Sequence, residues 1–219
     1  MGNTIGQDFE VKLAELLCTR LCHDLTGPIG AVNNGAEFLG EEGFSLQEQA
    51  VELIVNSAQQ AVSRLMFYRQ AYGRVNYQGE ASLNEVRALS EDFFRESRYK
   101  LEWPHHFTDS ADISVSRKMA KLILNILIII SGGMPRGGTI SLSLVKREDG
   151  QAEVKIRGEG TGIKEDKEFV AAFRRETDIE NINAKTVQPY FTSRMAHSLG
   201  VTLEMNIDES VFEISAIHP

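Results

Sequence analysis

The 219-residue sequence lacks the marks of a secreted, membrane-spanning or nucleic-acid-binding protein. It has only two cysteines, Cys18 and Cys22, which stand in one helix-like segment and cannot form a disulfide framework. The formal net charge is -8 and no cluster of lysine and arginine stands out, which argues against nucleic acid or an acidic membrane as the main partner. The most apolar run, residues 122–130, is too short to span a bilayer, and the N-terminal residues lack the pattern of a signal peptide. We therefore expect a cytoplasmic protein that binds neither membranes nor nucleic acid.

The first part of the chain has the apolar spacing of helices. The helical pattern extends from about residue 7 to residue 77 and is broken once, near the stretch GEEGFS at residues 40–45. Two helices joined by a short turn form a helical hairpin, which buries only part of its apolar surface by itself. Two copies would bury the rest in a four-helix bundle. We therefore predict that residues 1–78 form a dimerisation domain and that the protein is a homodimer.

Residues 79–219 alternate between helical and strand-like patterns. The sequence predicts helices near residues 83–97, 115–131, 164–174 and 184–199. Strands are predicted at residues 99–103, 139–147, 152–158, 201–207 and 210–216. Helices combined with an antiparallel-looking sheet indicate a second domain that is an α+β sandwich.

His23 lies in the helical stretch LCTRLCHDLTGPIGAVNNG, residues 17–35. Successive helical residues are about 100° apart, and His23 falls nearly opposite the predicted core stripe. That stripe comprises Val11, Ala14, Leu17, Cys18, Leu21, Leu25, Ile29, Val32, Ala36 and Leu39. Small residues one turn away leave the imidazole open to a docking partner. The competing interpretation is that His23 is an exposed histidine without a role.

Zinc is the obvious alternative for a histidine beside two cysteines. Cys18 and Cys22 share a face, but His23 is rotated by about 100° from Cys22, away from that face. A structural zinc site takes four ligands, and this helix offers only two on one side. We therefore predict that both cysteines are small buried residues at the edge of a helix interface.

The stretch HDLTGPIG resembles the phospho-acceptor motif of histidine-kinase dimerisation helices. The wider run LLCTRLCHDLTGPIGAVNNGAEFL is similar to the ChpT family of bacterial histidine phosphotransferases, and the resemblance extends over essentially the whole chain. It implies that His23 relays a phosphoryl group between aspartates of response-regulator receiver domains, with the receiver of a hybrid histidine kinase as donor. It also implies that Asp24 orients His23 or accepts its proton. The docking surface would be bordered by Thr19, Arg20, Thr26, Gly27, Gly30 and Asn34.

The second domain resembles the ATP-binding domain of histidine kinases, of Bergerat type, with key residues lost. Asn125 fits the first asparagine of the kinase pattern, but Ile129 replaces the second, which holds Mg²⁺ in the kinases. Gly158 stands where those enzymes carry the aspartate that reads adenine. An apolar side chain cannot coordinate a hard cation, so the resemblance implies no ATP binding and no cofactor, with Mg²⁺ supplied by the receiver. Two alternatives stay open: a dimeric scaffold or sensor without catalysis, and an ATP-dependent kinase.

Overall fold

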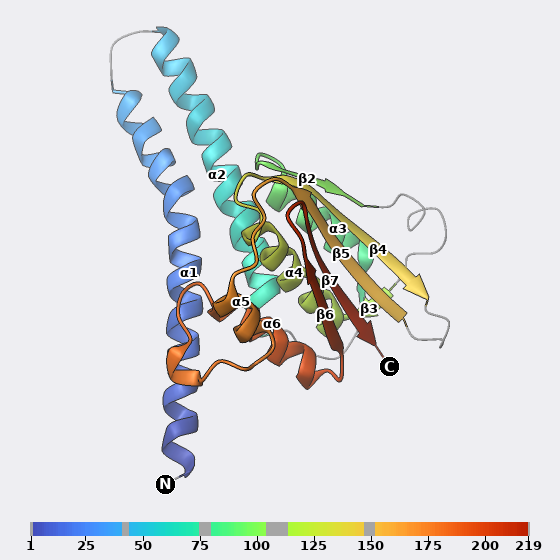
Figure 1. Cartoon of the computed structure of the whole chain (residues 1–219). Coiled ribbons are helices and arrows are strands. Elements are labelled where there is room, and N and C mark those ends of the chain that lie inside the picture. The colour runs from blue at the N-terminus through green and yellow to red at the C-terminus, as the bar shows by residue number, and fades with distance from the viewer. Residues whose placement is uncertain (1, 41–43, 75–79, 104–113, 147–151, 219) are drawn as a thin grey trace.

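A long helical hairpin stands beside an α+β domain in the computed structural model (Figure 1). The structure describes residues 2–40, 44–74, 80–103, 114–146 and 152–218. The hairpin consists of α1 (Gly2–Phe38) and α2 (Phe44–Tyr72), and α1 continues through Pro28. Near the tip the helices pack closely, because a Cβ on Gly35 would lie only 2.7 Å from Cγ1 of Ile54. The predicted hairpin is therefore present.

The second domain contains a five-stranded sheet. Its strand order is β2-β4-β5-β7-β6. All neighbouring pairs are antiparallel except β2 and β4, which are parallel, so the antiparallel expectation fails at this edge. The strands are β2 (Tyr99–Glu102), β4 (Gly138–Lys146), β5 (Ala152–Gly160), β6 (Thr202–Ile207) and β7 (Val211–His218).

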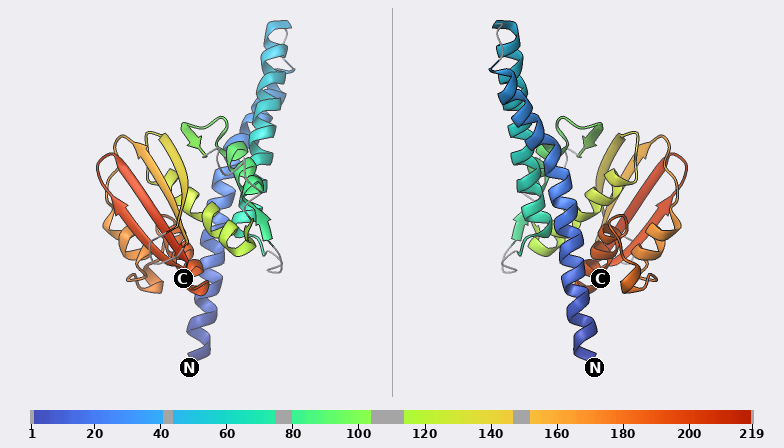
Figure 2. Two further views of the ribbon diagram at one scale, coloured as in Figure 1. Left: turned by 90° about the vertical axis from the view of Figure 1, so that its right-hand side faces the viewer. Right: turned by 90° about the vertical axis from the view of Figure 1, so that its left-hand side faces the viewer.

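Helices cover one face of this sheet and separate it from the hairpin (Figure 2). They are α3 (Leu83–Phe94), α4 (Arg117–Gly132), α5 (Lys167–Phe173) and α6 (Val187–Ser198). Two small elements were not expected: a 3₁₀ turn at Ile179–Asn181, and a two-stranded sheet of β1 (Glu80–Ser82) and β3 (Ser114–Ser116). The predicted α+β sandwich is confirmed.

The apolar run at residues 122–130 forms the central helix of the domain. Ser116 caps α4 by accepting a hydrogen bond from the backbone N–H of Met119. Every residue from Met119 to Ile130 is buried, because α2, α3, α6 and the sheet all pack around this helix. Apart from Lys121 and Asn125 these buried residues are apolar, and a helix that is apolar on nearly every side is a core helix. None of the helices in the described residues combines the length and apolar character needed to cross a membrane.

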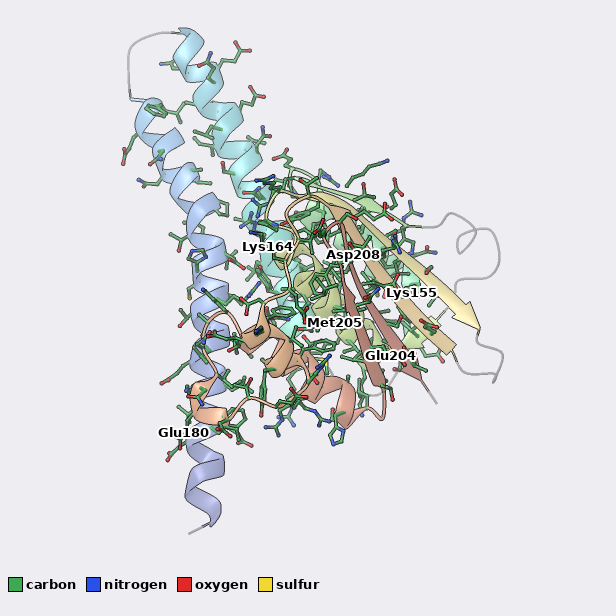
Figure 3. The ribbon with its side chains drawn as sticks, in the orientation of Figure 1. Lys155, Lys164, Glu180, Glu204, Met205 and Asp208 are labelled. Atoms are coloured by element: carbon green, nitrogen blue, oxygen red, sulfur yellow. The ribbon has the colours of Figure 1, made fainter. Side chains whose placement is uncertain are left out.

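The hairpin and the second domain share their hydrophobic cores. Phe67, Tyr68 and Ala71, at the end of α2, belong to the same buried cluster as α4 and the sheet. Phe9 of α1 packs with Tyr190 of α6 in a second cluster, where their rings meet edge to face. The Lys12 ammonium also donates to the carbonyl of Glu180, which lies against α1 in Figure 3. The two predicted domains, 1–78 and 79–219, are thus packed together through both helices of the hairpin.

The predicted core stripe of α1 is only partly correct. Its inward face includes Leu17, Leu21 and Pro28, whereas Val11 and Ile29 are 59% and 57% exposed. Cys18 and Cys22, predicted to be buried, are also exposed within the chain. Both α2 and the second domain pack against α1. The buried face of α1 therefore includes residues outside the predicted stripe.

Candidate functional site

His23 projects from an open face of α1, and 87% of its side chain is exposed. Thr19 and Thr26 are exposed near it and donate their hydroxyls to backbone carbonyls four residues earlier, at 2.8 and 2.7 Å. A Cβ placed on Gly27 or Gly30 would meet no atom within 4 Å. Asn34, further along the helix, is exposed. Because glycine destabilises a helix interior by about 1 kcal/mol relative to alanine, packing within the chain does not explain these two glycines.

Asp24 holds the imidazole of His23 in place. Its Oδ1 lies 3.2 Å from Nδ1 of His23, and its Oδ2 accepts a hydrogen bond of 2.5 Å from the hydroxyl of Tyr68. The Asp24 side chain is only 26% exposed. An ionised carboxylate can only accept hydrogen bonds, so a neutral imidazole making this contact carries its hydrogen on Nδ1 and has its lone pair on Nε2. Burial, together with the charge and hydrogen bond of Asp24, raises the pKa of Tyr68 far above its usual value, so Tyr68 remains a donor.

The main chain of Asp24 is also held from α2. Proline has no N–H, so Pro28 leaves the carbonyl of Asp24 without its usual helical partner. Nη1 of Arg64 donates to this carbonyl at 2.5 Å. Neither Arg64 nor Tyr68 was predicted from the sequence as a site residue. The signal that was available is Pro28, four residues after Asp24, which marks an unpaired carbonyl but does not identify its partner.

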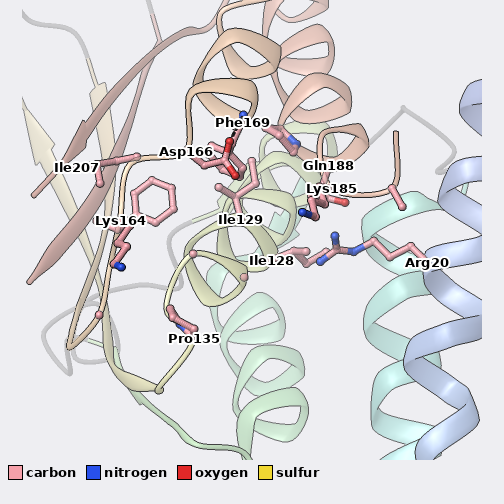
Figure 4. A pocket seen from close by; sticks show the side chains of 16 residues that line it. Arg20, Ile128, Ile129, Pro135, Lys164, Asp166, Phe169, Lys185, Gln188 and Ile207 are labelled. Atoms are coloured by element: carbon pink, nitrogen blue, oxygen red, sulfur yellow. Dashed lines mark hydrogen bonds between the residues drawn. The ribbon is translucent and has the colours of Figure 1, made fainter. Parts of the chain in front are cut away.

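Arg20 does not share the open face of His23. It turns inward, toward a cleft between α1 and the second domain (Figure 4). Its Nε is buried and has no hydrogen-bond partner among the residues that the structure describes. Burial raises the pKa of Tyr72 to about 12, and the nearby charge of Arg20 opposes that rise. Arg20 was predicted to lie beside His23 because helical periodicity alone does not show that the second domain packs on α1.

The cleft has a volume of about 510 Å³ and is lined by Ile129 and Gly162, which belong to the two stretches that resemble nucleotide-binding motifs of the kinases. Its walls include Ile128, Ile129, Phe169, Ile207 and Phe212, with Arg20, Lys164 and Lys185 also lining it (Figure 4). The residues present do not fit a magnesium nucleotide, because Ile129 offers no oxygen ligand. A Cβ on Gly158 would lie 2.5 Å from Sδ of Met134 and 2.7 Å from Cγ2 of Ile130. The position that reads adenine in the kinases therefore has no space for an aspartate.

Asn125, which fits the first asparagine of the kinase pattern, ties three helices together instead. It is fully buried on α4. Its Nδ2 donates to the carbonyls of Ala71 and Lys121, both at 2.8 Å, and its Oδ1 accepts from Nε2 of Gln188 at 2.9 Å. Gln188 in turn accepts from the hydroxyl of Tyr72 at 2.7 Å. This buried network fixes the second domain against the end of α2.

Replacing Asn125 with leucine, which has a similar volume, is expected to lower the free energy of unfolding by about 2–4 kcal/mol. The substitution leaves the carbonyl of Ala71 and the amide of Gln188 buried without these partners. Urea denaturation measures the loss. Asn34→Leu, on the exposed surface of α1, is the matched control and should stay within about 0.5 kcal/mol of wild type. A result for Asn125→Leu as small as that of the control would contradict the structural role of the network.

Comparison with known proteins covers both parts of the chain. A family model described as the histidine phosphotransferase C-terminal domain matches residues 83–211. Protein phosphotransferase ChpT of Brucella abortus (strain 2308) is 32% identical over 197 residues, which is 90% of either chain. A solved structure of a bacterial phosphotransferase matches with a TM-score of 0.78 and 30% identity, over 94% of this chain and 96% of that one. The similarity thus extends through the hairpin and the α+β domain together.

Proposed function

This chain belongs to the histidine phosphotransferase family, and we propose that His23 is the residue that carries the phosphoryl group. The chain is a phosphotransferase of a phosphorelay and not an autokinase. One observation supports His23 above all: its ring is 87% exposed, yet its Nδ1 is held by a carboxylate that is itself held from α2. An exposed histidine without a role would not need an oriented ring.

The proposed step is a direct exchange of one bond to phosphorus for another. The lone pair on Nε2 of His23 attacks the phosphorus of an aspartyl phosphate, an N–P bond forms, and the bonding electrons of the breaking P–O bond return to the aspartate carboxylate. The ring gains positive charge, which the adjacent Asp24 carboxylate stabilises while Nδ1 keeps its hydrogen. Transfer to a second receiver reverses these bond changes. Such a reaction asks mainly for positioning and charge neutralisation, and the receiver supplies Mg²⁺ in this proposal.

A phosphorelay protein exchanges phosphoryl groups with response regulators or kinases. We propose more narrowly that receiver domains dock on the open face of α1, with the receiver of a hybrid histidine kinase as donor. The face comprises Thr19, Thr26, Gly27, Gly30 and Asn34 around His23. The two glycines lower the stability of the helix but leave no side chain that projects from this surface. A second protein can therefore approach the backbone of α1 closely. The cytoplasmic location stays a prediction.

Transfer of a radioactive phosphoryl group tests the proposal. Purified receiver domains from the same organism, each phosphorylated by its kinase, are mixed with this protein, and a parallel reaction contains labelled ATP alone. We expect acid-labile label on this protein from at least one receiver and none from ATP. Label from ATP alone would contradict the conclusion that the cleft does not bind a magnesium nucleotide. A protein that takes label from no receiver would favour the alternative of a dimeric scaffold.

We also propose that two chains pair through an apolar surface of the hairpin. On α1 the surface includes Val11, Cys18, Cys22 and Ile29, all exposed. On α2 the exposed apolar residues recur at helical spacing: Val51, Val55, Val62, Leu65 and Met66. Large exposed apolar surfaces on a soluble chain mark protein interfaces. Burial against a second copy would complete the four-helix bundle predicted from the sequence.

Replacing Val55 with glutamate is expected to convert the dimer to a monomer. Val55 is 59% exposed in the single chain, and in the proposed dimer a carboxylate at this position would be desolvated without a partner. Sedimentation equilibrium measures the dissociation constant, which should rise at least about tenfold. Asn56→Glu adds the same charge at an exposed site on another face of α2 and should leave the constant unchanged. A wild-type protein that sediments as a monomer would refute the proposed pairing.

A further inference from the structure

We infer that Tyr68 and Arg64 of α2 are positioning residues, which hold Asp24 so that His23 presents Nε2 to the phosphoryl group. This inference rests on the proposed role of His23. Tyr68 and Arg64 lie one helical turn apart on the same face of α2, opposite Asp24. Tyr68 binds the side chain of Asp24 and Arg64 binds its backbone carbonyl. A single residue of α1 is thus fixed at two points by the neighbouring helix.

The hydrogen bond from Tyr68 holds the Asp24 side chain firmly because the Tyr68 ring itself cannot move freely. Its ring is buried and stacks almost parallel on Tyr72, with centroids 5.4 Å apart and an interplanar angle of 4°. Phe67 and Phe93 contact the same ring edge to face, at 6.1 and 5.7 Å. Since aromatic packing fixes the ring, the hydroxyl is held in place as well. It therefore selects one orientation of the Asp24 carboxylate, in which Oδ1 points to His23.

The grip on the main chain corrects a local weakness of α1. Pro28 removes the hydrogen bond that would normally stabilise the helix at Asp24, directly after the phosphoryl-accepting residue. The guanidinium of Arg64 replaces the missing N–H, and a charged donor forms a stronger hydrogen bond than a neutral one. The backbone that carries both His23 and Asp24 is thereby anchored to α2.

The chemical consequence concerns the tautomer of His23. With the carboxylate fixed at Nδ1, the hydrogen stays on that nitrogen and the exposed Nε2 has a free lone pair. A carboxylate that can rotate would leave Nδ1 without a constant acceptor. The hydrogen would then also occupy Nε2, and in that form the nitrogen facing the receiver is not a nucleophile.

Tyr68→Phe tests this inference, because it keeps the ring and removes only the hydroxyl. We expect the single-turnover rate of phosphoryl acceptance from a receiver to fall about tenfold, less than the roughly 10²–10⁴-fold that a group transferring a proton itself contributes, because Tyr68 acts only through Asp24. In mildly alkaline buffer, ¹⁵N NMR of the His23 ring should change from an Nδ1-protonated pattern in wild type to a mixture of tautomers in the variant. Tyr99→Phe is the matched control, since it also loses a hydroxyl with hydrogen-bond partners, here the carbonyls of Ser131 and Met134. It should match wild type in both measurements.

The outcomes separate the inference from the proposal on which it rests. If wild type accepts label on His23 and Tyr68→Phe keeps the wild-type rate, the inference is wrong while the proposed function stands. A slower variant with an unchanged ¹⁵N pattern would also overturn it, because Tyr68 would then act only on packing. Wild type that takes no label on His23 refutes the proposed function first. Arg64→Met, expected to lower the rate about threefold with the same shift toward mixed tautomers, decides the question if the phenylalanine variant fails to fold.

Discussion

Replacing His23 with alanine is expected to abolish acceptance of the phosphoryl group, lowering its rate by at least about 10³-fold, since removal of a nucleophile can cost an enzyme as much as about 10⁶-fold. In the proposed step His23 makes the only bond to phosphorus on this chain, so no residual transfer should remain on α1. The measurement is label transfer from a phosphorylated receiver under single-turnover conditions. Because His23 is exposed, the free energy of unfolding should change by no more than about 0.5 kcal/mol.

His197→Ala is the matched control for this experiment. His197 is an exposed histidine in the last turn of α6, so its replacement makes the same chemical change outside the proposed site. Transfer to the His197→Ala protein should equal transfer to wild type. Full labelling of His23→Ala, with or without loss in the control, would show that another residue receives the phosphoryl group.

Asp24→Asn is expected to produce the second large effect. The amide oxygen can still accept from Tyr68, which turns the amide NH₂ toward Nδ1 of His23. Since the NH₂ group can only donate, Nδ1 must then accept, and the hydrogen is placed on Nε2. The same exchange in a carboxylate–histidine pair of serine proteases fixes the wrong tautomer and lowers turnover about 10⁴-fold. We expect a loss on the order of 10³-fold here, measured by rapid quench of a single turnover.

Glu15→Gln supplies the control for loss of one acidic charge on α1. Glu15 is exposed on the same helix, two turns before His23, and its carboxylate has no hydrogen bond or ion pair within the part of the chain that the structure describes, while its backbone carbonyl accepts from the Thr19 hydroxyl. Its replacement should change transfer less than about threefold. An Asp24→Asn protein that behaves like this control would mean that Asp24 is an ordinary surface carboxylate.

The exposure of His23 was predictable because it depends on a local, periodic property of the sequence. The angular position of a residue on a helix follows from its number, and the polar and small residues around His23 share one face. The same reasoning failed for Arg20 and for the two cysteines. Helical periodicity alone implies one covered stripe on α1, whereas the second domain covers one side of the helix and an apolar strip remains exposed on the other.

The partners of Asp24 could not be predicted, since they depend on how the two helices align. Tyr68 and Arg64 are 44 and 40 residues away along the chain. They lie opposite Asp24 only because of how α1 and α2 are aligned along the hairpin. No pattern in the sequence predicts that alignment. The losses at Ile129 and Gly158 were visible as departures from a family motif. What the structure adds is that Met134 and Ile130 occupy the space beside Gly158, and that Asn125 binds protein backbone.

The fold shows the same division between local and long-range information. Capped, periodic helices such as α3 and α4 were predicted within a few residues of their bounds. The pair β1 and β3 was missed because each strand has three residues and the partners are far apart in sequence. The parallel pairing of β2 with β4 was missed for a related reason, since strand direction is set by the path of the intervening α4.

The most direct test of the central claim is to locate the phosphoryl group on wild-type protein after incubation with a phosphorylated receiver. Peptide mass spectrometry under non-acidic conditions identifies the residue, and ³¹P and ¹⁵N NMR of the intact protein identify the ring nitrogen. We expect a single phosphoryl group, bound to Nε2 of His23. A phosphoryl group on Nδ1, or on any other residue, would contradict it.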